Sequence, residues 1–291
     1  MPNHGGLGTR RVAHRLLGSL LGGLLVAATP GAAGLSTPSN STPAHGTVPN
    51  GTRQTRPTAG LPFDPAPLAG RCGDPAGAWL NTTWRGELRW QFNVGSIPGY
   101  LVEVSPETTP DDGPIDGPWP VLAAARSAAT TVATGRNDCD LPEDLALPQR
   151  YTGDTDRTAG VASDGSCGDR DGHNVVSFGN LTTGLLAVTC IWWDGHPGAS
   201  HSVEADILVD SNGGTFFLAR PADCQSRWDL EGILTHEFGH VFGLGHVPNA
   251  EHSTLTMTDG LPECSTTYRS LGLGDYLTLR GHADTRTHPA A

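Results

Sequence analysis

One eleven-residue segment in the C-terminal part of the chain constrains the fold more than any other feature. It contains His236, Glu237, His240, Gly243 and His246. His236 and His240 are four residues apart, so on a helix their imidazoles project from the same face and can bind one metal ion. Glu237 is rotated by about 100° from His236 and can reach a water molecule on that metal. Gly243 can adopt a left-handed conformation that ends the helix and brings in His246 as a third ligand.

Three imidazoles with one coordination position left open are typical of a catalytic zinc site rather than a closed structural site. The flanking sequence supports a helix here, because Ser226 followed three residues later by Asp229 predicts a capping box and Gly243 predicts the helix end. The sequence therefore predicts a buried helix with a metal site at its C-terminal end.

The pattern H-E-x-x-H-x-x-G-x-x-H resembles the signature of the metzincins, zinc endopeptidases that carry a Met-containing turn beyond the third histidine. Met257 lies eleven residues after His246, where that turn is expected. Residues 204–207 (EADI) resemble the strand before the zinc helix in the matrixin branch, and residues 271–276 (LGLGDY) resemble the start of its C-terminal helix. The resemblance covers roughly residues 79–281, and the zinc motif is its one highly specific part.

The resemblance implies a secreted zinc metalloendopeptidase with a mixed α/β (α+β) fold, a twisted mixed sheet, an active-site helix and a Met-turn. Glu237 would act as the general base beside one catalytic zinc. The histidines of a second, structural zinc in vertebrate matrixins have no counterpart here, and Val247 stands where matrixins usually have Ser. An extended polypeptide substrate would lie along an edge strand made of Leu185, Leu186, Ala187, Val188 and Thr189.

Hydrophobic patterning independently predicts a mixed α/β layer fold. An Ala-rich segment over residues 120–134 starts with Pro and is followed by Gly135, which is typical of a helix. Short apolar runs bounded by turn residues predict strands over residues 87–94, 174–178, 185–193 and 203–209.

The N-terminal sequence predicts export. Arg10, Arg11 and Arg15 precede an uncharged, mostly apolar run that is too short to span a bilayer, which is typical of a signal peptide over residues 1–33. Cleavage after Ala33 or Ala28 fits, and the Arg pair leaves a twin-arginine signal as the alternative. Residues 34–70 read as a disordered linker or pro-segment, residues 71–283 as the folded domain, and residues 284–291 as a polar tail. The mature chain is therefore expected to be extracellular and free of the membrane.

Six cysteines follow the predicted signal peptide. An even number in an exported chain predicts three disulfides with 15 possible connectivities. Cys224 and Cys264 bracket the zinc motif and the turn Met, so we expect them to pair. Residues 71–75 (RCGDP) resemble the matrixin cysteine switch, in which a thiolate occupies the open zinc position, but a switch would leave five other cysteines. The disulfide is favoured and the switch stays open; the remaining candidates are Cys72, Cys139, Cys167 and Cys190.

Charge limits the partners. All 18 basic residues are Arg, against 30 acidic residues, and the net charge of −12 argues against nucleic acid or an anionic membrane as partner. A monomer that binds a polypeptide substrate is expected. Hard oxygen ligands for a calcium ion are offered by Asp164, Asp169, Asp171, Asp206 and Asp210. The alternatives are a non-catalytic exported zinc-binding module, which the intact Glu237 disfavours, and a peptidase restricted to cell-wall peptides.

Overall fold

The computed structural model describes residues 10–13, 50–53, 68–84, 86–102, 119–182, 184–194, 200–212 and 215–287. Most of the predicted signal peptide (residues 1–33) and linker (residues 34–70) lies outside these ranges. Two short pieces of them are described as strands, β1 (Arg10–Ala13) and β2 (Asn50–Arg53), both paired antiparallel with β8 (Leu185–Asp194). Residues 50–53 are thus extended and paired with β8, within the segment predicted to be a linker or pro-segment.

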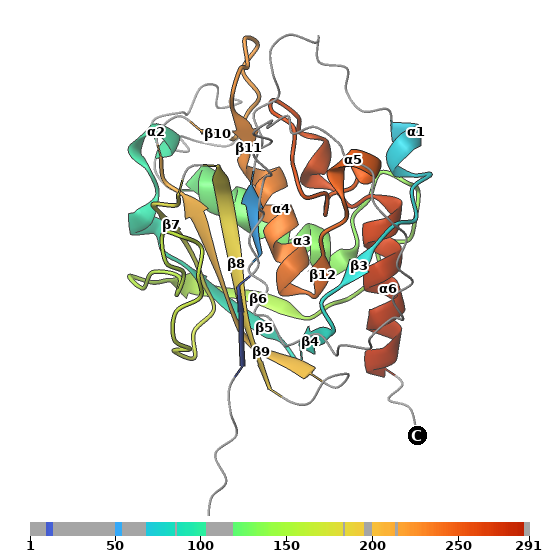
Figure 1. The fold of residues 1–291 in the computed structure, drawn as a ribbon, viewed down its shortest axis with the longest axis horizontal. Helices are drawn as coiled ribbons and strands as arrows, with labels where there is room; N and C mark the ends of the chain where they lie inside the picture. Colours follow the sequence, from blue (N-terminus) through green and yellow to red (C-terminus); the bar gives the residue numbers. More distant parts are fainter. Residues whose placement is uncertain are drawn as a thin grey trace, which may run out of the picture.

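The centre of the fold is an eight-stranded sheet with the order β1-β8-β9-β7-β5-β6, in which β2 also pairs with β8 and β4 with β9 (Figure 1). Neighbouring strands from β9 to β6 run parallel, whereas β8 is antiparallel to β9. The mixed α/β class predicted from the sequence is therefore confirmed. The remaining strands of this sheet are β4 (Thr82–Trp84), β5 (Leu88–Phe92), β6 (Gln149–Asp154), β7 (Val175–Gly179) and β9 (Ser200–Asp210).

Helices α3 (Trp119–Thr134) and α4 (Leu230–Val241) pack against each other on one face of this sheet (Figure 1). On α3, Ala125, Ala128 and Ala129 are fully buried, and their small side chains let the neighbouring helix approach closely. The other helices are α1 (Leu68–Arg71), α2 (Gly99–Val102), α5 (Asn249–His252) and α6 (Leu273–Thr287). Short strands β3 (Ala78–Trp79) and β12 (Leu244–Gly245) form a separate antiparallel pair, and β10 (Phe216–Phe217) and β11 (Trp228–Asp229) a parallel one.

The cap of α4 differs from the prediction. Asp229 is itself the N-cap, and its carboxylate accepts a hydrogen bond from the Gly232 amide at 3.0 Å. Ser226 lies outside the helix, where its amide donates to Glu263. Asp229 also pairs with Arg269, so the start of the metal-site helix is tied to the C-terminal part of the chain.

All six cysteines form disulfides, and the expected Cys224–Cys264 pair is among them. Cys72 pairs with Cys139, which confirms a disulfide at Cys72 and excludes the cysteine switch in this state. Cys167 pairs with Cys190 and fastens a loop over a second apolar cluster that contains Trp192 and Leu208. Three disulfides are compatible with a secreted protein.

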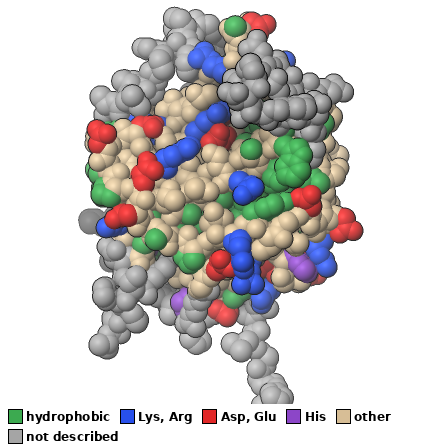
Figure 2. All heavy atoms as spheres, turned by 180° about the vertical axis from the view of Figure 1, so that it is seen from behind, with side chains coloured by type: hydrophobic (Ala, Val, Ile, Leu, Met, Phe, Trp, Pro, Cys, Tyr) green, Lys and Arg blue, Asp and Glu red, His purple; other side chains and the backbone are tan. Residues whose placement is uncertain are grey.

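Other boundaries also differ from the prediction. Helix α6 continues to Thr287, beyond the predicted domain end at residue 283. Strand β6 was not predicted, because its residues are polar and none of them is fully buried. None of the described helices combines the length and apolar character needed to cross a membrane. On the back of the molecule, acidic and Arg side chains are intermingled over the described surface (Figure 2).

Candidate metal centre

The three motif histidines converge on one point. The Nε2 atom of His236 lies 3.0 Å from that of His240 and 3.0 Å from that of His246, and the third Nε2 pair is 2.9 Å apart. These three side chains form the one group of three or more potential His, Cys, Asp or Glu ligands found among the described residues. His236 and His240 are fully buried, whereas His246 is partly exposed. The site can therefore hold a metal ion with one side open.

Backbone carbonyls determine which ring nitrogen faces the centre. Nδ1 of His236 lies 2.7 Å from the Thr256 carbonyl oxygen, and Nδ1 of His240 lies 2.8 Å from the Leu244 carbonyl oxygen. A carbonyl can only accept, so both Nδ1 atoms carry the proton and both Nε2 atoms present a lone pair. Burial also lowers the pKa of His236 to about 4, although the bond to Thr256 opposes this shift. Burial lowers the pKa of His246 well below its ordinary value as well.

This donor set fits zinc. Lone pairs that face one another at about 3 Å repel unless a cation lies between them, and imidazole nitrogen is a preferred zinc ligand. A tetrahedral zinc ion with bonds of about 2.0–2.1 Å separates its nitrogen ligands by roughly 3.3 Å. The observed distances of 2.9–3.0 Å are a few tenths of an ångström shorter, which small side-chain rotations can accommodate.

Glu237 is fully buried beside the ligands, and its carboxylate has a specific partner. The Thr189 hydroxyl on β8 donates to Oε2 of Glu237 at 2.6 Å. Thr189 is also fully buried, so this charge-assisted bond is shielded from water. The bond restricts the orientation of the Glu237 carboxylate.

Gly243 ends the helix as predicted from the sequence. Its φ of +104° lies in the left-handed region, and its amide donates to the His240 carbonyl at 2.9 Å. A Cβ atom at this position would lie 2.7 Å from the Thr82 carbonyl oxygen and 2.5 Å from the Trp79 ring. Only glycine fits here, and the resulting turn carries the chain to His246.

Met257 packs against helix α4 at Gly239. It is almost fully buried, and a Cβ atom on Gly239 would lie 2.4 Å from its sulfur. The sulfur thus packs against the bare backbone of Gly239, between His236 and His240 in the sequence. The turn itself is anchored by Asp275, whose carboxylate accepts bonds from the amides of Thr256 at 2.8 Å and Met257 at 3.2 Å.

The five aspartates considered for calcium do not form such a centre. Asp206 accepts bonds from the amides of Gly160 and Val175, and Asp210 accepts one from the amide of Leu181. Asp164 accepts bonds from Ser166 two residues away, and Asp171 pairs with Arg157. Asp169 does not join a group of three metal-binding side chains within the described ranges. Most of these carboxylates therefore serve to fasten loops, and their arrangement gives the calcium prediction no support.

The segment predicted to bind a substrate strand lies in β8 and is paired on both sides within the described residues. Leu185, Leu186, Ala187, Val188 and Thr189 form the first half of β8. This strand pairs with β9 on one side, and β1 and β2 pair with its other side. The edge expected to receive a substrate strand is therefore one that accepts antiparallel strands from the chain itself.

No protein-family model matches the chain, and no curated protein matches it. What the chain does must be inferred from the site itself. Three residues that orient the site were not recognised from the sequence in that role, namely Thr189, Asp275 and Arg71. For Asp275 and Arg71 the sequence offers only weak signals, an acidic residue in a predicted helix and an Arg next to a cysteine.

Proposed function

We propose that this protein is a secreted zinc-dependent metalloendopeptidase of the metzincin type. The observation that carries the proposal is the combination of three convergent histidine Nε2 atoms with the buried, hydrogen-bonded carboxylate of Glu237 on the same helix turn. A structural zinc site needs the ligands alone, whereas an adjacent, oriented carboxylate is what peptide hydrolysis requires.

His236, His240 and His246 would hold the zinc. When bound, that ion supplies Lewis-acid polarisation of the scissile carbonyl and lowers the pKa of its water toward about 7. Glu237 accepts the proton of the attacking water and then delivers it to the leaving amine nitrogen. Thr189 keeps the accepting carboxylate oriented through its 2.6 Å bond. Glu237 thus transfers the protons, and Thr189 fixes the orientation of its carboxylate.

Strand β8 would position the substrate. On the side of β8 away from β9, where β2 pairs, main-chain hydrogen bonds could instead hold an extended polypeptide, and such bonds tolerate many side chains. The antiparallel pairing of β2 with Leu185, Val188 and Thr189 supports this use of β8, because it shows that this side of β8 can pair with an added antiparallel strand. A substrate strand would have to take the place of β2. Removal of the predicted signal peptide would remove β1 as well.

The decisive experiment is a substitution that separates metal binding from proton transfer. Glu237→Gln should retain zinc but lose roughly 10²–10⁴-fold in kcat on an unstructured substrate such as casein, because the amide cannot accept the proton. Glu251→Gln, an exposed change on α5, serves as the matched control and should keep full activity. Cleavage by the wild-type chain should stop with 1,10-phenanthroline.

Two results would contradict the proposal. Peptidase activity retained in the Glu237→Gln variant would show that another group is the base. Zinc binding without any cleavage by the mature wild-type chain would instead favour a non-catalytic zinc-binding module.

A further inference from the structure

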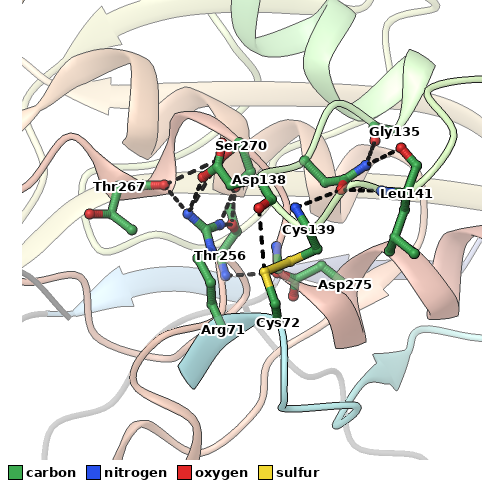
Figure 3. The surroundings of a disulfide bond; sticks show 12 residues. Arg71, Cys72, Gly135, Asp138, Cys139, Leu141, Thr256, Thr267, Ser270 and Asp275 are labelled. Carbon is green, nitrogen blue, oxygen red and sulfur yellow. Dashed lines mark hydrogen bonds and ion pairs between the residues drawn. A yellow bond between two sulfur atoms is a disulfide. The ribbon is translucent and has the colours of Figure 1, made fainter. Parts of the chain in front are cut away.

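Arg71 is a fully buried arginine at the start of the folded region. One guanidinium nitrogen, Nη2, donates to the Thr256 hydroxyl at 3.2 Å and to the Ser270 carbonyl at 2.6 Å. The other, Nη1, pairs with Asp138 at 3.0 Å and also donates to the carbonyl of Thr267. Three separate segments of the chain therefore meet at one side chain, as Figure 3 shows.

Thr256 connects this arginine to the metal centre. Its carbonyl accepts the bond from His236, and its amide donates to Asp275 at 2.8 Å. Its hydroxyl donates to the Ser270 carbonyl at 2.6 Å and accepts from Arg71. Every polar group of Thr256 is thus engaged. The carbonyl that orients the first ligand cannot turn unless a buried bond breaks.

The same N-terminal segment reaches the second orienting carbonyl. Trp79 on β3 pairs with Leu244 on β12, and Leu244 is the residue whose carbonyl accepts from His240. The Leu80 amide also donates to the Gly243 carbonyl at 2.8 Å, at the turn that leads to His246. We call residues 68–80 the strap, because they run from the Met-turn to the end of the metal-site helix.

The strap is fastened covalently next to Arg71. Cys72 is bonded to Cys139, 67 residues away, and the loop that holds Cys139 also supplies Asp138 to the guanidinium (Figure 3). The Asn137 side chain accepts bonds from the amides of Cys139 and Leu141, which fixes this loop. The disulfide and the ion pair therefore hold the same two segments together.

We infer that the strap is a permanent part of the metal site, in which Arg71 and the Cys72–Cys139 disulfide act as positioning elements that set the affinity for zinc. The inference rests on the proposed zinc site and deepens it. The RCGDP sequence, as part of the strap, thus stays in the mature protein, and any N-terminal processing stops before residue 68.

Zinc affinity tests this role without reference to catalysis. The full secreted chain is titrated with zinc against a chromogenic chelator, and the Co²⁺-loaded form is examined by its visible spectrum. Arg71→Met and the pair Cys72→Ala with Cys139→Ala should each weaken zinc binding on the order of 10-fold, as other changes behind metal-bound histidines do. Arg71→Lys should fall between Arg71→Met and wild type, because a lysine keeps the charge but not the fork of donors.

The disulfide Cys167–Cys190 supplies the matched control. Its removal by Cys167→Ala with Cys190→Ala should lower Tm and leave the zinc affinity within about twofold of wild type, because it fastens the opposite face of the sheet. N-terminal sequencing of the wild-type secreted chain should find an N-terminus before residue 68.

Several outcomes would overturn the inference. One is an unchanged zinc affinity in the folded Arg71 and Cys72–Cys139 variants. Another is an equal loss of zinc affinity in the Cys167–Cys190 control. A third is a zinc-loaded mature chain whose N-terminus lies after Cys72. If Arg71→Met fails to fold, the Arg71→Lys variant and the N-terminal sequence still decide. A wild-type chain that binds no zinc would instead contradict the proposed function, on which the role of the strap depends.

Discussion

The bond between Thr189 and Glu237 makes a sharp quantitative prediction. Thr189→Val removes the hydroxyl and keeps a β-branched side chain suited to strand β8. The lost bond is 2.6 Å long, fully buried and made to a carboxylate, so it contributes about 1.5–3 kcal/mol. If the orientation it provides is needed for proton transfer, kcat should fall roughly 10–150-fold.

The assay is cleavage of a quenched fluorescent peptide by variants loaded with equal zinc. We expect the loss in kcat with little change in KM, because Thr189 contacts Glu237, the proposed base, and not a histidine of the metal site. Thr189→Ser keeps a hydroxyl and should recover most of the rate. Thr131→Val removes another buried hydroxyl, on α3, and should leave kcat unchanged.

Two results would refute this reasoning. One is a Thr189→Val variant with wild-type kcat, which would mean that other contacts orient Glu237. The other is a Thr189→Ser variant as slow as the valine variant, which would point to packing rather than the hydrogen bond.

Three other properties can be predicted from the described contacts. Gly243→Ala should reduce the free energy of unfolding by at least about 2 kcal/mol in urea titrations. The new side chain would combine a left-handed φ of +104° with a Cβ atom 2.7 Å from the Thr82 carbonyl oxygen. The control Gly281→Ala should lose no stability, because its Cβ atom would meet no described atom within 4 Å. Chelation of zinc present at a thousandfold its Kd should remove about 4 kcal/mol of stability, or roughly 8–16 °C in Tm, and an unchanged Tm would contradict a bound metal. Burial raises the pKa of Asp206 from 3.8 to about 7, so the folded state holds a proton that the unfolded state has lost, and stability should fall by up to about 4 kcal/mol as pH rises from 4 to 8. Asp206→Asn should flatten this part of the Tm profile; an identical slope in the variant would show that other groups cause it.

The sequence predicted the parts of the site that depend on helix geometry. His236, His240 and Glu237 lie within one turn and a half, so helical periodicity alone places them together. Gly243 was predictable because glycine is the residue that left-handed turns favour. These features follow from local backbone rules, which a single sequence displays directly.

The orienting residues were not predictable in the same way. Thr189 is 48 residues from Glu237, and Arg71 is 185 residues from Thr256. Whether a hydroxyl on β8 faces the helix depends on the register of the sheet, and a shift by one residue would turn it to the other face. The prediction of the α4 cap was wrong for a related reason. Asp229 and Ser226 can both cap a helix, and the pairing of Asp229 with Arg269 in the tertiary structure favours Asp229.

The chemistry of the orienting groups also bears on what the site can do. Both known partners of the histidine Nδ1 atoms are neutral carbonyls, of Thr256 and Leu244. A carboxylate partner would make the imidazoles more basic and stronger donors. With carbonyl partners the histidines donate less charge, so a bound divalent cation keeps more of its Lewis acidity. The cost is weaker intrinsic binding, which rigid placement of the ligands can offset, because less side-chain freedom is lost when the metal binds. A site of this kind depends on its supporting bonds for affinity, so we expect the strap to contribute to zinc binding although it is far from the histidines in sequence.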